Sequence, residues 1–97
     1  MDIQVRRIVV LVDDNGRSPF KEWRDSISDL SLGAAIDARL ARVRNGNFGD
    51  HKSVGDGVYE LRIPKGPGFR IYYALEGDTV VILLAGGDKK VKLKILT

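Results

Sequence analysis

Two arginines in a predicted β-hairpin are the side chains of this sequence that could best do chemistry. Two apolar, aromatic-rich runs flank residues 64–68, Pro-Lys-Gly-Pro-Gly, which predicts a hairpin. The apolar residues Leu61 and Ile71 are expected to face each other. Arg62 then lies directly opposite Arg70, and like charges in facing positions destabilise a sheet. An anion between the guanidiniums would relieve the repulsion, and their planar forks fit phosphate particularly well.

The alternation of the two strands brings a carboxylate and a tyrosine to the same face. Because facing side chains lie on one side of a sheet, Glu60 and Tyr72 share the face of the arginines. Glu60 could instead neutralise one arginine diagonally and form a structural ion-pair cluster, and the pattern leaves both interpretations open. Tyr72 could stack on a base or form a hydrogen bond, whereas Tyr73 is predicted in the core.

The segment before the hairpin, residues 46–57, is predicted to be a glycine-rich loop with polar side chains. His51 could take a proton from a hydroxyl nucleophile, because its unperturbed pKa is near neutrality, although a lone loop histidine is often merely exposed. Lys52 could contact phosphate. With no cysteine and one histidine in the chain, thiolate zinc sites and cysteine nucleophiles are excluded, and no metal site is predicted. Binding remains, or phosphodiester chemistry performed by bases and cations without a metal.

Composition predicts one small, soluble domain with a basic half. The 97 residues suit a single domain, 1–97, and the net charge is +3. Residues 1–30 carry five Lys/Arg against six Asp/Glu, and residues 31–97 carry eleven against seven. The basic half indicates a polyanion, an acidic protein partner or a solvated surface. The longest apolar run, residues 79–85, is far short of the ~20 residues that span a bilayer, so we expect a cytoplasmic protein that makes no membrane contact.

The elements that position these side chains alternate in pattern along the chain, and the order predicts an α+β fold with two helices packed on one face of a mostly antiparallel sheet. The polar face of the hairpin is then expected to be open. The expected elements are strands at residues 3–12, 57–63, 69–76 and 79–86 and helices at about 18–30 and 31–44. Residues 88–97 alternate between apolar residues and lysines, which predicts a last strand whose lysines either prevent edge aggregation or contact nucleic acid.

Both helices are expected to be amphipathic. Ser18 is a typical N-cap before Pro19, and Ser31 can cap the second helix, which ends at the pair Asn45-Gly46. The apolar stripes expected to face the sheet are Phe20, Trp23, Ile27 and Leu30 on the first helix and Leu32, Ile36, Leu40 and Val43 on the second. The charged residues expected to stay in solvent on the second helix are Asp37, Arg39, Arg42 and Arg44.

Residues 46–73, with L-L-A-G-G-D-K-K at 83–90, resemble the RelE/ParE toxin superfamily, and more closely its HigB-like branch of addiction-module killer proteins. The resemblance covers about residues 18–90, including the F-x-x-W start of the first helix and the R-L-x-R segment at 39–42. It implies two helices packed on a twisted antiparallel sheet, which agrees with the fold expected from the pattern.

The resemblance implies a type II toxin that enters the ribosomal A site and cleaves mRNA without a metal or cofactor, the ribose 2′-hydroxyl attacking the adjacent phosphate. Its implied partners are the ribosome, mRNA and a cognate antitoxin, usually a helix-turn-helix protein. Arg62 and Arg70 match the family's strand arginines and are the expected phosphate clamp, with Lys52 at its basic loop position. Expected RNA contacts are Tyr72, Lys65, Lys89 and Lys90.

One departure leaves the general base open. Relatives continue beyond G-G-D-K into a helix or an acid/base-bearing tail, whereas no His or Tyr follows Tyr73 here. Either His51 or a lysine serves as the base, or catalysis depends on ribosomal RNA and electrostatics, or the toxin is weakened. The alternatives to the endonuclease are a ParE-like inhibitor of DNA gyrase and a degenerate toxin that only binds its antitoxin.

Overall fold

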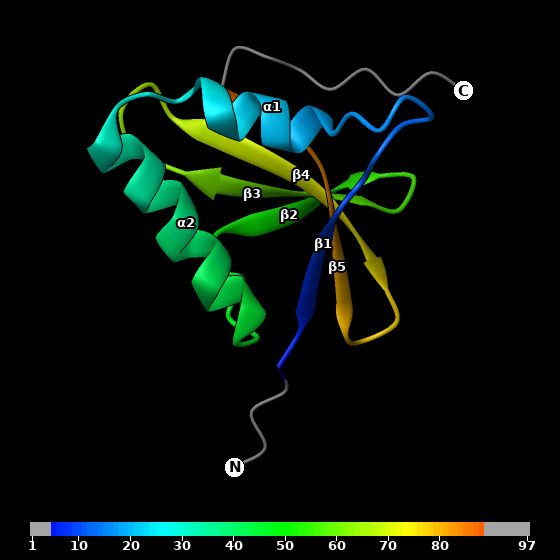
Figure 1. Ribbon diagram of the computed structural model, residues 1–97. Helices are drawn as coiled ribbons and strands as arrows, with labels where there is room; N and C mark the ends of the chain where they lie inside the picture. The colour runs from blue at the N-terminus through cyan, green and yellow to red at the C-terminus, as the bar shows by residue number, and fades with distance from the viewer. Residues whose placement is uncertain (1–4, 89–97) are drawn as a thin grey trace.

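The computed structural model describes residues 5–88, which form a five-stranded sheet with two helices packed on one face (Figure 1). The strands stand in the order β1-β5-β4-β3-β2, with β1 parallel to β5 and the other pairs antiparallel. The predicted α+β, RelE-like class is therefore confirmed. The elements are β1 (Arg7–Val10), α1 (Pro19–Ser26), α2 (Leu30–Arg44), β2 (His51–Gly55), β3 (Val58–Ile63), β4 (Phe69–Glu76) and β5 (Val80–Asp88). The tail strand predicted at residues 88–97 lies almost wholly outside the described residues.

The core fills the space between the helices and one face of the sheet. The predicted alternation of the hairpin is confirmed, because its apolar residues point to this face. The buried core residues are Phe20, Ile36, Val43, Leu61, Ile63, Phe69, Ile71, Tyr73, Val81 and Leu83. Tyr73 lies in the core as predicted, and burial, together with Tyr59, raises its pKa to about 12. A phenol so deep in the core acts as a packing group.

Trp23 packs on the core through a gap left by a glycine of β5. A Cβ added at Gly86 would lie 2.1 Å from Cε3 of Trp23, so the indole rests directly on the backbone of the strand. Its ring packs edge to face on Phe69, with the ring centroids 5.7 Å apart, and against Phe20, with the centroids 5.8 Å apart. Trp23 is partly buried and packs against the core, and its ring connects α1 to β4 and β5.

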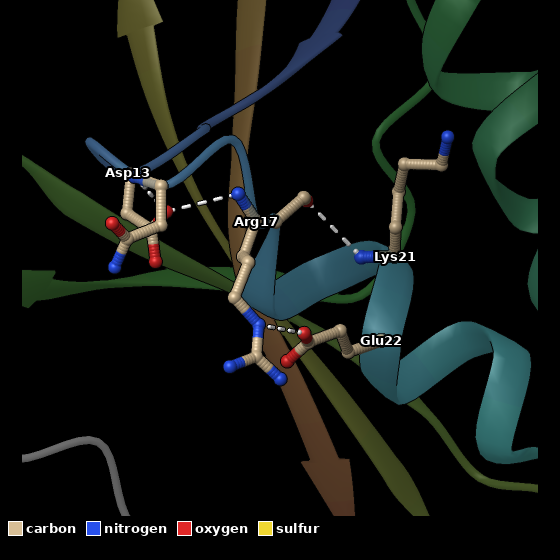
Figure 2. Close-up of polar contacts among 6 residues, drawn as sticks. Asp13, Arg17, Lys21 and Glu22 are labelled. Atoms are coloured by element: carbon tan, nitrogen blue, oxygen red, sulfur yellow. Dashed lines mark hydrogen bonds and ion pairs between the residues drawn. The ribbon is translucent and has the colours of Figure 1, made fainter.

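The start of α1 follows the sequence pattern. Ser18 is the N-cap and its Oγ accepts a hydrogen bond from the amide of Lys21 at 3.2 Å (Figure 2). In the preceding turn, one carboxylate oxygen of Asp13 accepts from the amide of Arg17 at 2.9 Å. The Arg17 side chain in turn pairs with Glu22 of the first helical turn at 2.8 Å. The Ser18 contact satisfies an amide that the helix leaves free at its N-terminus, and the other two contacts hold the turn against the first helical turn.

The boundary between the helices falls earlier than predicted. α1 ends at Ser26, and Ile27 already has extended backbone angles. Asp29, not Ser31, caps α2, accepting a hydrogen bond from the Leu32 amide at 3.0 Å. A carboxylate is both a good cap acceptor and favourable at the positive end of a helix, so the break moves to Asp29. Leu30, predicted on the apolar stripe of α1, is 90% exposed, and that prediction was wrong.

Two other segments differ from the sequence prediction. Within the described part of the chain, β1 covers only Arg7–Val10, a shorter strand than predicted. The predicted loop at 46–57 contains β2, which pairs antiparallel with β3 and carries a bulge near Ser53. Every residue of β2 is exposed, so the strand has no alternation of apolar and polar side chains that would reveal it. Its stability comes from pairing with β3.

Candidate functional site

The two arginines of the hairpin face each other as predicted. Arg62 on β3 pairs with Arg70 on β4, and Leu61 pairs with Ile71. The loop between the strands is short, so the alternation of the flanking residues fixes the register. Both guanidiniums therefore project from the face of the sheet opposite the helices, side by side near the loop at residues 64–68.

The Glu60 carboxylate forms ion pairs with both arginines on their protein-facing side. Its Oε1 lies 3.0 Å from Nε of Arg62, which donates a hydrogen bond, and its Oε2 lies 3.6 Å from Nη1 of Arg70. The Glu60 side chain is 4% exposed, whereas the side chains of Arg62 and Arg70 are 39% and 32% exposed. The carboxylate thus neutralises the like-charged pair from the protein side, and the arginines reach solvent on the other. Glu60 makes the cluster stable, and the exposed sides of the guanidiniums can still bind an anion.

A hollow of about 180 Å³ opens beside the arginines. It is lined by Asp50, Arg62, Ile63, Pro64, Gly68, Phe69 and Arg70. The apolar members Ile63 and Phe69 are buried and form an apolar wall beside the guanidiniums. A second hollow of about 330 Å³ is lined by Trp23, Ile27 and Asp29 among others. Its described lining includes carboxylates and no cation, so it is less suited to phosphate.

The register of β2 separates the two other predicted catalytic residues. Lys52 pairs with Glu60 and therefore lies on the face of the arginines, where it adds a third, exposed cation. His51 pairs with Leu61 and so points to the opposite face. Its Nδ1 donates to the carbonyl of Gly49 at 2.8 Å, and its ring lies 5.5 Å from that of Phe48. The structure brings Lys52 to the arginines and does not bring His51 there.

The predicted RNA contacts have different positions. Tyr72 lies on the arginine face opposite Glu60 but is 5% exposed, so its ring is not free to stack on a base as predicted. Burial beside Glu60, which the open-face prediction did not anticipate, is the reason. Lys65 is exposed in the loop between β3 and β4, of which Pro64 and Gly68 line the hollow. Lys89 and Lys90 lie outside the described residues.

One buried arginine beneath the site was missed by the sequence analysis. Arg39 on α2 was predicted in solvent but is 8% exposed. Its guanidinium donates to the carbonyls of Phe48 at 2.9 and 3.1 Å, Asp50 at 2.8 Å and Arg62 at 2.9 Å. Burial, followed by the nearby charge of Arg42, lowers the pKa of Arg39. The sequence signals were the R-L-x-R segment at 39–42 and a glycine-containing loop able to surround a long side chain.

Within residues 5–88, no group of three histidine or carboxylate side chains is arranged to hold a metal ion. Neither helix of this part of the chain is long and apolar enough to cross a membrane.

A two-helix layer on a mostly antiparallel sheet, with paired cations on the uncovered face of a hairpin, defines a RelE-like α+β protein. Residues 22–95 match the family described as phage derived protein Gp49-like (DUF891), and the chain therefore belongs to this family of RelE/HigB-like toxins. An uncharacterized protein of Haemophilus influenzae (strain ATCC 51907 / DSM 11121 / KW20 / Rd) is 47% identical over 75 residues, which cover 77% of this chain and 76% of the relative. Membership implies a toxin of a toxin–antitoxin pair, with an antitoxin as partner.

Proposed function

We propose that this protein is a HigB-like toxin that cleaves mRNA on the ribosome. The observation that supports the proposal best is the arginine pair itself. Two guanidiniums face each other across β3 and β4, are held by the buried carboxylate of Glu60, and border a hollow with apolar walls. Paired guanidiniums with exposed N–H groups suit the two non-bridging oxygens of a phosphodiester.

The proposed reaction is an internal transfer at one phosphodiester. The ribose 2′-hydroxyl loses its proton and attacks the adjacent phosphorus, the bond to the 5′-oxygen of the next nucleotide breaks, and that oxygen takes up a proton. The products are a 2′,3′-cyclic phosphate and a 5′-hydroxyl. Negative charge builds up on the phosphorane, and preplaced cations stabilise it more than they stabilise the substrate. Arg62 and Arg70 are proposed as the clamp, with Lys52 as a third cation.

The proposal leaves open which group accepts the proton of the 2′-hydroxyl. His51 points away from it, so a base on this chain would be Lys52 or a carboxylate, and ribosomal RNA is the other source. The proposed partners are translating ribosomes, mRNA and a helix-turn-helix antitoxin that neutralises the toxin by covering its basic face. These targets place the proposed action in the cytoplasm.

Primer extension on a translated mRNA tests the proposal. Purified protein is added to a reconstituted translation system with and without ribosomes, and new 5′ ends are expected at A-site codons only when ribosomes are present. Arg62→Ala and Arg70→Ala are each expected to keep the fold and to lower the cleavage rate by about 10² or more, the effect of removing one stabilising donor from a charged transition state. Arg17→Ala, which removes an exposed arginine that pairs with Glu22 and does not line the hollow, is the matched control and should cleave normally.

Two results would contradict the proposal. Folded Arg62 and Arg70 variants that cleave at the wild-type rate would remove the arginine clamp from the mechanism. No ribosome-dependent ends with folded wild-type protein would exclude the endonuclease. Inhibition of gyrase supercoiling at stoichiometric protein would then identify a ParE-like inhibitor, and inhibition of neither target would leave a protein that only binds its antitoxin.

A further inference from the structure

The guanidinium of Arg39 fastens α2 to the backbone on which the arginine site is built. Nη1 donates to the carbonyl of Arg62, and Nη2 donates to the carbonyl of Asp50, at 2.9 and 2.8 Å. The same Asp50 carbonyl accepts a hydrogen bond from the amide of Arg62 at 3.0 Å. Both backbone groups of Arg62 are thus tied to Arg39, the carbonyl directly and the amide through one shared acceptor.

The same contact fixes the start of β2. Nε and Nη2 of Arg39 both donate to the carbonyl of Phe48, so one guanidinium holds the carbonyls of residues 48 and 50. Lys52 follows two residues later, on the face of the arginines. Figure 1 shows β3 running toward α2. Arg39 therefore connects Arg62, Asp50 and the start of the strand that carries Lys52 to helix α2.

Gly49 leaves room for this guanidinium because it has no side chain. A Cβ at Gly49 would lie 2.8 Å from Nη2 and 3.0 Å from both Cζ and Nε of Arg39, and the residue has φ +65°. The loop therefore passes over the guanidinium at a distance that a side chain would not permit. Glycine adopts this backbone conformation without the steric cost that other residues carry.

Burying this cation is costly, and its hydrogen bonds within the described residues all go to carbonyls. Charged groups buried without a carboxylate partner are rare, because removing their hydration is expensive. A leucine or methionine could fill the same space without that cost. What an apolar side chain could not do is fix three carbonyls at once, and two of those carbonyls belong to residues that line the proposed phosphate hollow.

We propose that Arg39 is a positioning residue for the phosphate clamp. It does not contact the RNA, and it sets the distance and angle at which Arg62 meets the phosphate relative to Asp50 and Lys52. This inference rests on the proposed function. A misplacement on the order of 1 Å at a reacting centre can cost about 10²-fold in rate. Loss of the Arg39 guanidinium is therefore expected to lower the turnover rate more than the affinity for the ribosome.

Arg39→Lys is the test, because lysine keeps the charge but cannot donate to three carbonyls in the fixed geometry of a guanidinium. Cleavage of mRNA is measured over a range of ribosome concentrations, and rates are expressed per folded molecule from circular dichroism. We expect kcat to fall about tenfold or more, with the half-saturating ribosome concentration within about twofold of wild type. Arg24→Lys is the matched control, because Arg24 of α1 is bound bidentately by Asp37 of α2 and does not line the hollow. This variant should cleave like wild type.

A second readout separates failure of the inference from failure of the proposed function. Inorganic phosphate is titrated while NMR follows the Nε–Hε signals of Arg62 and Arg70. Phosphate should shift both signals in wild type and bind several-fold more weakly in Arg39→Lys. No shift in wild type would overturn the proposed site and this inference with it. Normal phosphate binding and normal kcat in Arg39→Lys would overturn this inference alone.

If Arg39→Lys does not fold, Gly49→Ala replaces it in both measurements, because the added methyl group presses on the same guanidinium. The expected pattern is the same, lower kcat with similar ribosome affinity. A folded Gly49→Ala variant with wild-type kcat and phosphate affinity would contradict the positioning role.

Discussion

Replacing Glu60 by glutamine removes the negative charge between Arg62 and Arg70 while keeping nearly the same side-chain shape. The wild-type carboxylate accepts one charge-assisted hydrogen bond at 3.0 Å and forms one longer ion pair at 3.6 Å. A hydrogen bond to a charged group contributes about 1.5–3 kcal/mol, and the longer pair less. The guanidiniums that remain are about one-third exposed, so water screens part of their repulsion. We expect Glu60→Gln to lower the free energy of unfolding by about 2 kcal/mol.

For a domain of 97 residues this change corresponds to a fall of about 10 °C in Tm, measured by circular dichroism. Glu22→Gln is the matched control, because Glu22 also pairs with an arginine at 2.8 Å, but both side chains are more than half exposed. An exposed pair contributes roughly 0–1 kcal/mol, so this control should melt within a few degrees of wild type.

Anions provide the sharper part of this experiment. Without Glu60 the two guanidiniums lack their counter-charge, so added inorganic phosphate should raise the Tm of Glu60→Gln more than that of wild type, through binding to the folded state alone. Chloride at equal ionic strength is the control for simple screening. A Glu60→Gln variant that melts like Glu22→Gln, or that phosphate and chloride stabilise equally, would refute the view that Glu60 balances an anion-binding arginine pair.

Two further predictions concern the packing of the helices. The hydrogen bond from Arg24 lowers the pKa of Asp37 in the folded state, so the pair's stabilisation is present above the unfolded pKa near 4 and is lost as pH falls through the folded pKa. The Tm difference between wild type and Asp37→Asn should therefore shrink between about pH 6 and pH 2, and a difference constant with pH would contradict the pairing. Gly86→Ala should destabilise by about 2–3 kcal/mol, because its methyl group would lie 2.1 Å from Trp23. The single tryptophan makes fluorescence the measurement, and unchanged emission with unchanged Tm would show that the indole does not rest on β5.

The sequence determined the features that depend on neighbours along the chain. Ser18 and Pro19 mark the start of α1 because capping is completed within one helical turn. The facing of Arg62 and Arg70 was predictable because a short hairpin loop and strand alternation leave few other registers. The α+β class followed from the order of these elements. Asp29 shows the limit, because two good capping residues lay close together and only one is used.

The tertiary structure decided which side chains meet across elements. His51 and Lys52 are adjacent in the chain, yet pairing of β2 with β3 sends them to opposite faces, and nothing in the exposed sequence of β2 specified that pairing. The burial of Glu60 and Arg39 depends on what covers them, and that coverage comes from residues distant in sequence. Local patterns report the propensity of a segment, whereas burial and long-range hydrogen bonds are set by the packing of all segments together. The arginine pair could therefore be predicted from the sequence, whereas the burial of the groups that hold it in place is decided by the tertiary structure.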